Sequence, residues 1–190
     1  MLTVLGSAKH FTRDRENVAL MACYAERHGI PYHIETHNYK PGFWNKQQAM
    51  IKHLPRAEWL LYVDSDAYVT QRNLSVMDWL HKYVHNRQET HVVLSEIRYE
   101  WHPVGGFDAG ILMVRSSDIG KKFLQDWVAF GCHHWQNSEN GALNSLFLHW
   151  VVPSYHIDRP CDTELQETGD ALCNQSLGVG SPTELTLMSR

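Results

Sequence analysis

The sequence predicts an α/β protein with a Rossmann-like three-layer sandwich, in which helices cover both faces of a mostly parallel central sheet. Strand-like and helix-like segments alternate through the first half of the chain, which is the order of parallel α/β folds. The segment 59–63 is apolar throughout, as expected of a strand buried on both faces. The helical segments carry their apolar residues mainly on one face, which predicts packing against a sheet.

Each expected element in the first half has a local reason. The helix over 14–28 places apolar residues on one face and is followed by Gly29, a common residue after the last helical turn. The next helix is stopped by Pro55, which cannot continue it. In chain order, we expect strands over 2–5, 32–36 and 59–63 and helices over 14–28 and 44–54.

The second half is predicted to be mixed, ending in a different kind of segment. Ser75 and Asp78 fit a capping pattern at the start of a helix. Residues 161–190 are poor in aromatics and lack periodicity, so we expect a 1–160 domain and a loop-rich or partly disordered tail over 161–190. The further expected elements are strands over 92–94 and 110–114 and helices over 75–84, 117–130 and 139–150.

Composition narrows the function classes. The chain has 190 residues and a formal net charge of -4, which suits one domain and excludes a strong basic field for nucleic acid. No apolar run approaches the length of about 18 residues that a membrane-spanning helix needs. The cysteines contain no CxxC pair, and Cys161 and Cys173 are either a disulfide or free thiols, depending on the compartment. N-x-S/T sequons occur at Asn73 and Asn174 and favour a secretory location only weakly.

A pair of carboxylates follows the central strand directly. Asp64-Ser65-Asp66 comes after the apolar run 59–63, where ligands bind in open α/β sheets. Two like charges this close need a counter-ion, and oxygen ligands suit a hard divalent cation such as manganese or magnesium. Such an ion neutralises a diphosphate and assists departure of a nucleoside diphosphate. The sequence therefore predicts a metal site at Asp64 and Asp66, with an acidic surface turn as the alternative.

Other candidates lie further along the chain. Asp108 sits in a glycine-bearing segment that ends at Gly110, where glycine permits close approach of a ligand. Asp108 either holds a sugar hydroxyl or acceptor, or belongs to an ordinary turn into a strand. Glu139 begins a predicted helix and either faces the ligand or simply complements the helix dipole.

Several blocks, in order along residues 1–155, resemble glycosyltransferase family 34. This family comprises galactosyl-, mannosyl- and xylosyltransferases with the GT-A nucleotide-diphospho-sugar transferase fold. The similar blocks are Asn17 with Cys23-Tyr24-Ala25-Glu26-Arg27-His28-Gly29, Phe43-Trp44-Asn45-Lys46, Ala57-Glu58-Trp59 through Asp64-Ser65-Asp66-Ala67, Phe107-Asp108-Ala109-Gly110 with Val114-Arg115-Ser116-Ser117, Phe123-Leu124-Gln125-Asp126-Trp127 and Ser138-Glu139-Asn140-Gly141-Ala142-Leu143.

The resemblance implies a manganese-dependent enzyme that transfers a hexose or pentose from a UDP- or GDP-sugar to a glycan acceptor, with retention of configuration. It implies the Golgi lumen if a membrane anchor lies outside this chain, and otherwise the cytoplasm. Carried over by position, Asp64, Ser65 and Asp66 would bind metal and donor. The other implied site residues are Ser7 and Ala8 near the nucleotide and Lys46, Asp108, Ala109, Gly110 and Glu139 around the sugar or acceptor.

The chain departs from the family pattern at two points. Asp108 stands where the family usually has asparagine, which exchanges an amide donor for an acceptor. Asn174 stands near the place of a metal-binding histidine, and His156 is a conceivable substitute. Two alternatives therefore stay open: a catalytically impaired binding relative of the same fold, and a phosphohydrolase of the haloacid dehalogenase type. The latter usually has a small residue where this chain has Tyr68.

Overall fold

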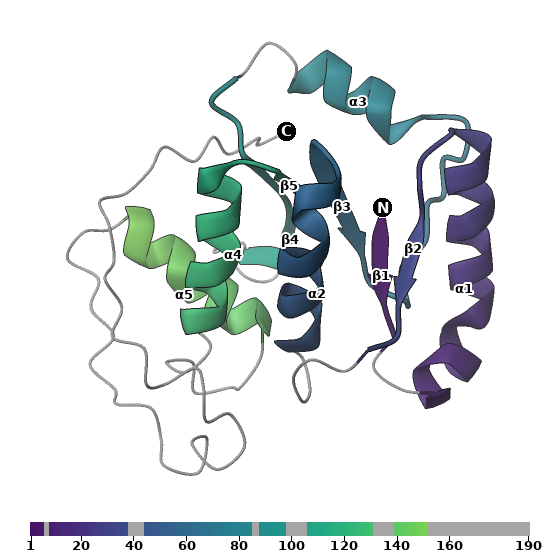
Figure 1. The fold of residues 1–190 in the computed structure, drawn as a ribbon, viewed down its shortest axis with the longest axis horizontal. Coiled ribbons are helices and arrows are strands. Elements are labelled where there is room, and N and C mark those ends of the chain that lie inside the picture. The colour runs from purple at the N-terminus through teal and green to yellow at the C-terminus, as the bar shows by residue number, and fades with distance from the viewer. Residues whose placement is uncertain (6–7, 38–43, 85–87, 98–105, 131–138, 152–190) are drawn as a thin grey trace.

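The computed structural model describes residues 1–5, 8–37, 44–84, 88–97, 106–130 and 139–151 (Figure 1). Within them, a five-stranded sheet is flanked by helices. The strands are β1 (Leu2–Val4), β2 (His33–Glu35), β3 (Trp59–Val63), β4 (Val92–Ile97) and β5 (Gly106–Arg115). The helices are α1 (Ala8–Arg27), α2 (Asn45–His53), α3 (Val76–Tyr83), α4 (Asp118–Phe130) and α5 (Glu139–Val151), and a 3-10 turn, η2 (Leu54–Arg56), follows α2.

The strand order is β2-β1-β3-β5-β4. β1 pairs in parallel with β2 and β3, whereas β5 pairs antiparallel with both β3 and β4. Consequently β1, β2, β3 and β4 run in one direction and β5 alone runs against them. This confirms the expected mostly parallel sheet, and it places the first residues of β5 beside the carboxyl end of β3.

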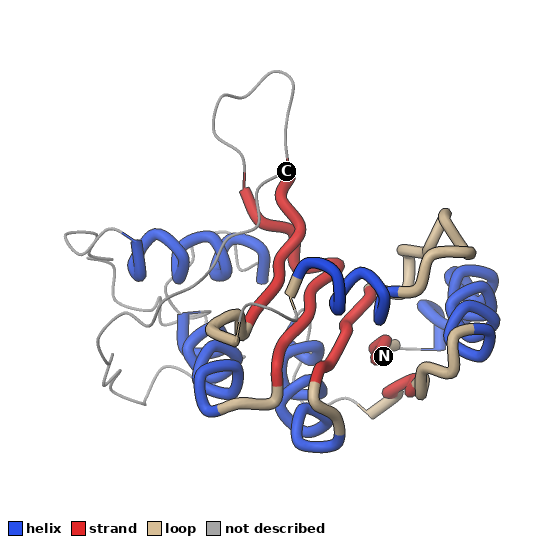
Figure 2. Tube along the Cα trace, turned by 90° about the horizontal axis from the view of Figure 1, so that it is seen from above, coloured by secondary structure: helices blue, strands red, loops and turns tan. Residues whose placement is uncertain are grey.

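Alternation along β3 divides the core between the two faces of the sheet. Leu60 and Tyr62 pack in a cluster with residues of α2, α4 and α5, whereas Leu61 and Val63 pack with residues of α1 and α3. Figure 2 shows α2 and α4 on one side of the strands, with α3 lying across the strands in this view. Side chains in a strand point alternately to opposite faces, so the uninterrupted apolar run supplies both cores. The prediction that 59–63 is a central strand buried on both faces is confirmed.

The ends of two helices follow from local chemistry. Gly29 has φ +63°, and its N–H donates to the carbonyl of Glu26, while the N–H of Ile30 donates to that of Ala25. This is a Schellman ending, for which glycine carries no steric cost. At the start of α3, the Ser75 hydroxyl accepts from the N–H of Met77, which confirms the predicted cap.

Two boundaries differ from the prediction by four residues or more. Helix α1 begins at Ala8 rather than at residue 14. The sequence pattern missed the first turns because they are largely exposed and so lack an apolar face. Strand β5 begins at Gly106 rather than at residue 110, because the glycine-bearing segment pairs with β4. The proposed 161–190 tail lies outside the described residues, as do Cys161 and Cys173. In the described part of the chain, no helix combines the length and the apolar character needed to cross a membrane.

Candidate functional site

The candidate site lies where β3 ends and β5 begins. The N–H of Asp64 donates to the carbonyl of Gly110 at 2.8 Å, one step beyond the pairing of Val63 with Ile111. Because β5 runs antiparallel to β3, the segment from Asp108 to Gly110 lies next to Asp64. Two motifs that are more than forty residues apart in sequence therefore meet at one edge of the sheet.

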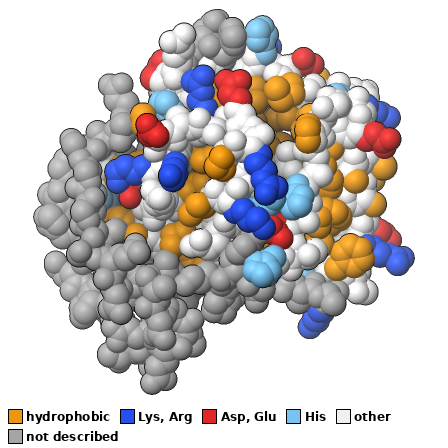
Figure 3. All heavy atoms as spheres, viewed as in Figure 1, with side chains coloured by type: hydrophobic (Ala, Val, Ile, Leu, Met, Phe, Trp, Pro, Cys, Tyr) orange, Lys and Arg blue, Asp and Glu red, His pale blue; other side chains and the backbone are white. Residues whose placement is uncertain are grey.

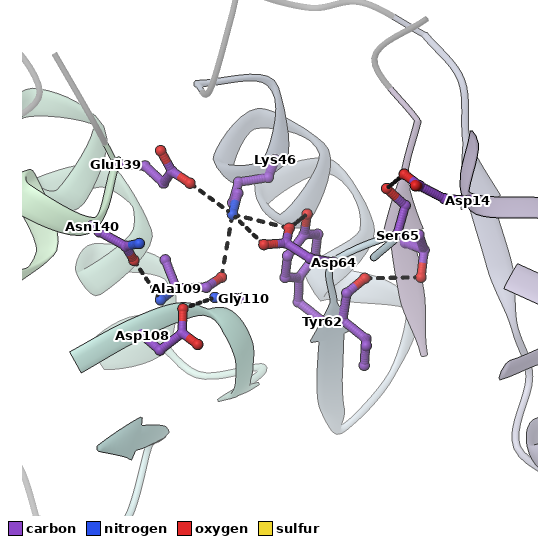
Figure 4. A network of polar contacts seen from close by, with 12 residues as sticks. Asp14, Lys46, Tyr62, Asp64, Ser65, Asp108, Ala109, Gly110, Glu139 and Asn140 are labelled. Atoms are coloured by element: carbon purple, nitrogen blue, oxygen red, sulfur yellow. Dashed lines mark hydrogen bonds and ion pairs between the residues drawn. The ribbon is translucent and has the colours of Figure 1, made fainter. Parts of the chain in front are cut away.

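Lys46 of α2 joins the acidic residues of this edge (Figure 4). Its Nζ atom lies 3.0 Å from Asp64 Oδ1 and 3.0 Å from Glu139 Oε1, and it donates to the carbonyl of Ala109 at 3.4 Å. The side chains of Lys46 and Glu139 are only 8% and 9% exposed, so water screens the attraction between them only weakly. The structure thus brings together Lys46, Asp64, Ala109 and Glu139, which the family resemblance places around the metal, the donor sugar or the acceptor.

Asp64 is held from the sheet as well. The hydroxyl of buried Tyr62 donates to Asp64 Oδ1 at 2.6 Å. Burial raises the pKa of Asp64 above its ordinary value, against the lowering effects of Lys46 and Tyr62. The Asp64 side chain still keeps 31% of its surface exposed. Its carboxylate is therefore fixed by protein on one side and open on another.

An irregularity between β4 and β5 shapes the segment opposite Asp64. The register shifts between Leu94 and Ser95, and Ser95 Oγ donates to the carbonyl of Ile111 at 3.2 Å across the shift. Asp108 Oδ1 accepts from the N–H of Gly110 at 2.8 Å. Bulges of this kind commonly re-aim side chains beside functional sites. Here residues 109–111 of β5 have no register partner on β4, and Asp108 bonds to its own strand within this segment.

Gly110 packs directly against two carboxylates. A Cβ atom built there would lie 3.1 Å from Asp64 Oδ2 and 3.2 Å from Asp108 Oδ1. Such contacts are tighter than most real ones, so any side chain would press on both oxygens. Glycine therefore permits close approach of the protein's own carboxylates here, whereas the expected close approach of a ligand stays a prediction.

Two asparagines on α5 hold the start of β5, and the sequence prediction missed their role. Asn140 Oδ1 accepts from the N–H of Ala109 at 2.7 Å, and Asn144 Oδ1 accepts from that of Phe107 at 2.9 Å. Asn144 Nδ2 also donates to the Phe107 carbonyl at 3.2 Å, so its amide imitates a pairing strand. The available signal was their spacing of four, which places both on one helix face.

The remaining predicted residues lie differently. Ser65 turns toward α1, where its hydroxyl donates to Asp14 Oδ2 at 2.6 Å, and Asp66 is exposed. Ala8 is the first residue of α1, so this helix does begin near the end of β1. Ser7, His156 and Asn174 lie outside the described residues.

The charge balance of the edge suits a bound cation. Asp64, Asp66, Asp108 and Glu139 are carboxylates, whereas their basic neighbours include Lys46, which contacts Asp64 and Glu139, and Arg13, which interacts with the charge of Asp66. Charge repulsion from Asp66 further raises the pKa of Asp64, so the two carboxylates are close enough to interact electrostatically. An all-oxygen donor set with excess negative charge fits manganese or magnesium.

A comparison with known families decides the membership of the chain. The galactosyl transferase GMA12/MNN10 family matches residues 21–152, which is more than half of the chain. The chain belongs to this family. The matched range contains Lys46, the Asp64-Ser65-Asp66 segment, Asp108 and Glu139, and the resemblance to glycosyltransferase family 34 is confirmed.

Relatives and a solved structure agree with this membership. An alpha-1,2-galactosyltransferase of Schizosaccharomyces pombe, described as uncharacterized, is 24% identical in an alignment of 139 residues that covers 55% of this chain and 36% of the relative. The rice protein "Probable glycosyltransferase 6" (Oryza sativa subsp. indica) is 29% identical in an alignment of 115 residues that covers 57% of this chain and 23% of the relative. The chain thus spans about a third or less of the length of these relatives.

The fold itself has a solved counterpart. The crystal structure of a glycosyltransferase involved in the glycosylation of the major capsid of PBCV-1 aligns with a TM-score of 0.59 at 16% identity, over 80% of this chain and 74% of that one. At this identity the likeness concerns the fold alone, and it confirms the expected GT-A-type α/β sandwich.

Proposed function

We propose that this chain forms the catalytic core of a metal-dependent glycosyltransferase that moves a hexose or pentose from a nucleotide-diphosphate sugar to a glycan acceptor. The observation that carries the proposal is the position of Asp64. It lies at the carboxyl end of the central strand, is fixed by Lys46 and Tyr62, and packs against Gly110, where a Cβ atom would lie 3.1 Å from its Oδ2. Family membership supplies the class of reaction.

Asp64 and Asp66 are the proposed metal ligands, and Ser65 is proposed to complete the donor-binding turn. A manganese or magnesium ion bound there would neutralise the diphosphate of a UDP- or GDP-sugar and assist departure of the nucleotide. Tyr62 and Lys46 hold the Asp64 carboxylate in one orientation, so little reorganisation is needed when the donor binds.

The residues beyond the metal ligands are proposed to surround the sugar and the acceptor. Asp108 and Glu139 would line the donor sugar, with Lys46, Ala109 and Gly110 between them and Asp64. Ser7 and Ala8 would lie near the nucleotide, at the start of α1. Transfer with retention and a Golgi location, through an anchor outside this chain, complete the proposal on the strength of the family resemblance.

A donor screen tests the proposed reaction. The protein is incubated with manganese and a panel of UDP- and GDP-sugars, and mass spectrometry follows donor hydrolysis and transfer. Asp108→Asn should change the preferred sugar more than it changes nucleotide affinity, because Asp108 is proposed to face the sugar. The matched control is Asp78→Asn, which alters an exposed carboxylate on α3.

The outcomes separate the alternatives. Donor turnover with an altered sugar preference only in Asp108→Asn supports the proposal. Metal-dependent nucleotide binding without any turnover would instead favour the impaired binding relative. Unchanged donor selectivity in Asp108→Asn would contradict the role given to this side chain.

A further inference from the structure

A second polar cluster lies between strand β2 and the end of helix α2. His53 Nε2 lies 3.0 Å from Glu35 Oε2, and His33 Nε2 lies 3.9 Å from the same oxygen. One ligand atom from each of the three residues lies within 4.8 Å of the other two. Glu35 and His53 are buried, whereas the His33 side chain is 51% exposed. The cluster therefore has two fixed groups and one at the surface.

One of the three separations is already close to what a tetrahedral zinc ion requires. Zinc-to-ligand bonds of about 2.0–2.1 Å place neighbouring ligand atoms about 3.3 Å apart. The contact between His53 and Glu35 is already near this value, and an exposed His33 needs to move by less than about 1 Å relative to Glu35. Two histidines, one glutamate and an open fourth position form a known zinc ligand set.

We propose that His33, Glu35 and His53 bind a zinc ion or a similar borderline divalent cation, at a site separate from Asp64 and Asp66. Imidazole ligands favour zinc, copper or nickel, whereas the all-oxygen edge of β3 favours magnesium or manganese. The two sites therefore select different ions. The bound ion would join the short edge strand β2 to helix α2.

Two exposed basic side chains contact residues of this cluster. Lys52 Nζ lies 3.2 Å from Glu35 Oε2, and Arg56 contacts His53 Nδ1 at 3.3 Å. Figure 3 shows basic, histidine and acidic side chains gathered on the face that contains α2. Lys52 and Arg56 are both exposed and long, so each can turn into solvent when an ion binds. Lys52 then acts as a competitor for the Glu35 carboxylate.

Zinc binding to the full chain tests the site. The protein is dialysed against zinc, and the bound metal and the thermal unfolding midpoint are measured for the wild type, His33→Ala and Lys52→Met. The chain contains thirteen histidines, so His81→Ala, which removes an exposed histidine of α3, is the matched control. Because His33 is half exposed, its removal leaves the core intact, whereas His53→Gln serves as a second, buried variant.

The proposal expects one zinc ion fewer in His33→Ala than in His81→Ala, and a smaller rise of the unfolding midpoint with zinc. Lys52→Met should bind zinc several-fold more tightly, because the competing ammonium is gone. Asp66→Ala should leave this zinc site unchanged. Equal zinc content and affinity in the wild type and His33→Ala, or weaker zinc binding in Lys52→Met, would overturn the site.

Discussion

Replacing Lys46 by methionine removes the cation that lies between Asp64 and Glu139. Methionine keeps most of the length and apolar volume of the lysine stem, so the change is mainly one of charge. Glu139 then loses its ion-pair partner while only 9% of its side chain is exposed. Asp64 is better placed, because it keeps the hydrogen bond from Tyr62 and 31% exposure. Most of the cost therefore comes from Glu139.

Breaking a buried ion pair by removing one partner costs about 3–5 kcal/mol, and the exposure of Asp64 places our expectation near the lower value, about 3 kcal/mol. For a domain of this size, that loss lowers the unfolding midpoint by about 10 °C. Urea unfolding followed by tryptophan fluorescence measures the free energy of unfolding directly. The double variant Lys46→Met/Glu139→Gln should recover all but about 1 kcal/mol, because no unpaired buried charge is then left at Glu139.

Asp126→Asn is the matched control. Lys122 Nζ lies 2.7 Å from Asp126 Oδ2, which is closer than Lys46 lies to either partner, but the Lys122 side chain that is left without its partner is 36% exposed. Loss of a helical pair that leaves an exposed charge costs only about 0.5 kcal/mol. Equal losses in Lys46→Met and Asp126→Asn, or no recovery in the double variant, would refute the reasoning that burial rather than distance sets the cost.

Further expectations concern glycines and pH. Gly110→Ala should weaken manganese-dependent nucleotide binding about tenfold, a loss of about 1.4 kcal/mol, because the new methyl group presses on Asp64. Gly106→Ala, whose methyl group would contact Asn144 instead, should leave the nucleotide affinity measured by calorimetry near the wild-type value. Gly120→Ala should lower the free energy of unfolding by about 3 kcal/mol, because its Cβ would meet the Arg115 carbonyl oxygen; wild-type stability in urea would contradict this. Burial raises the pKa of Asp64, and a metal ligand must be the deprotonated carboxylate. As the pH is lowered, manganese affinity should therefore begin to fall at a higher pH than the ordinary aspartate pKa of 3.8 implies. Manganese affinity measured at a series of pH values checks this expectation.

The sequence was sufficient for those parts of the fold that depend on local patterns. The apolar run before Asp64 identified the central strand with its observed ends, and Gly29 identified the end of α1. Both features act within a few residues: burial on two faces leaves no polar position in a strand, and a left-handed backbone favours glycine.

The contacts of the site depend on strand direction and could not be read in the same way. Nothing local reveals that β5 runs against β3, yet that direction places Asp108 and Gly110 beside Asp64. The family resemblance named Lys46 and Glu139 but not their ion pair, which needs α2 and α5 to meet over the same edge. Asn140 and Asn144 acquire their role only because the backbone of β5 lies within reach.

Calorimetric titration of UDP and GDP, with and without manganese, tests the central assignment most directly. Asp66→Ala is compared with Glu26→Ala, which removes another exposed carboxylate, in the last turn of α1. The account predicts nucleotide binding that requires manganese, falls at least tenfold in Asp66→Ala and persists in Glu26→Ala. Nucleotide affinity that is independent of manganese, or unchanged in Asp66→Ala, would contradict it.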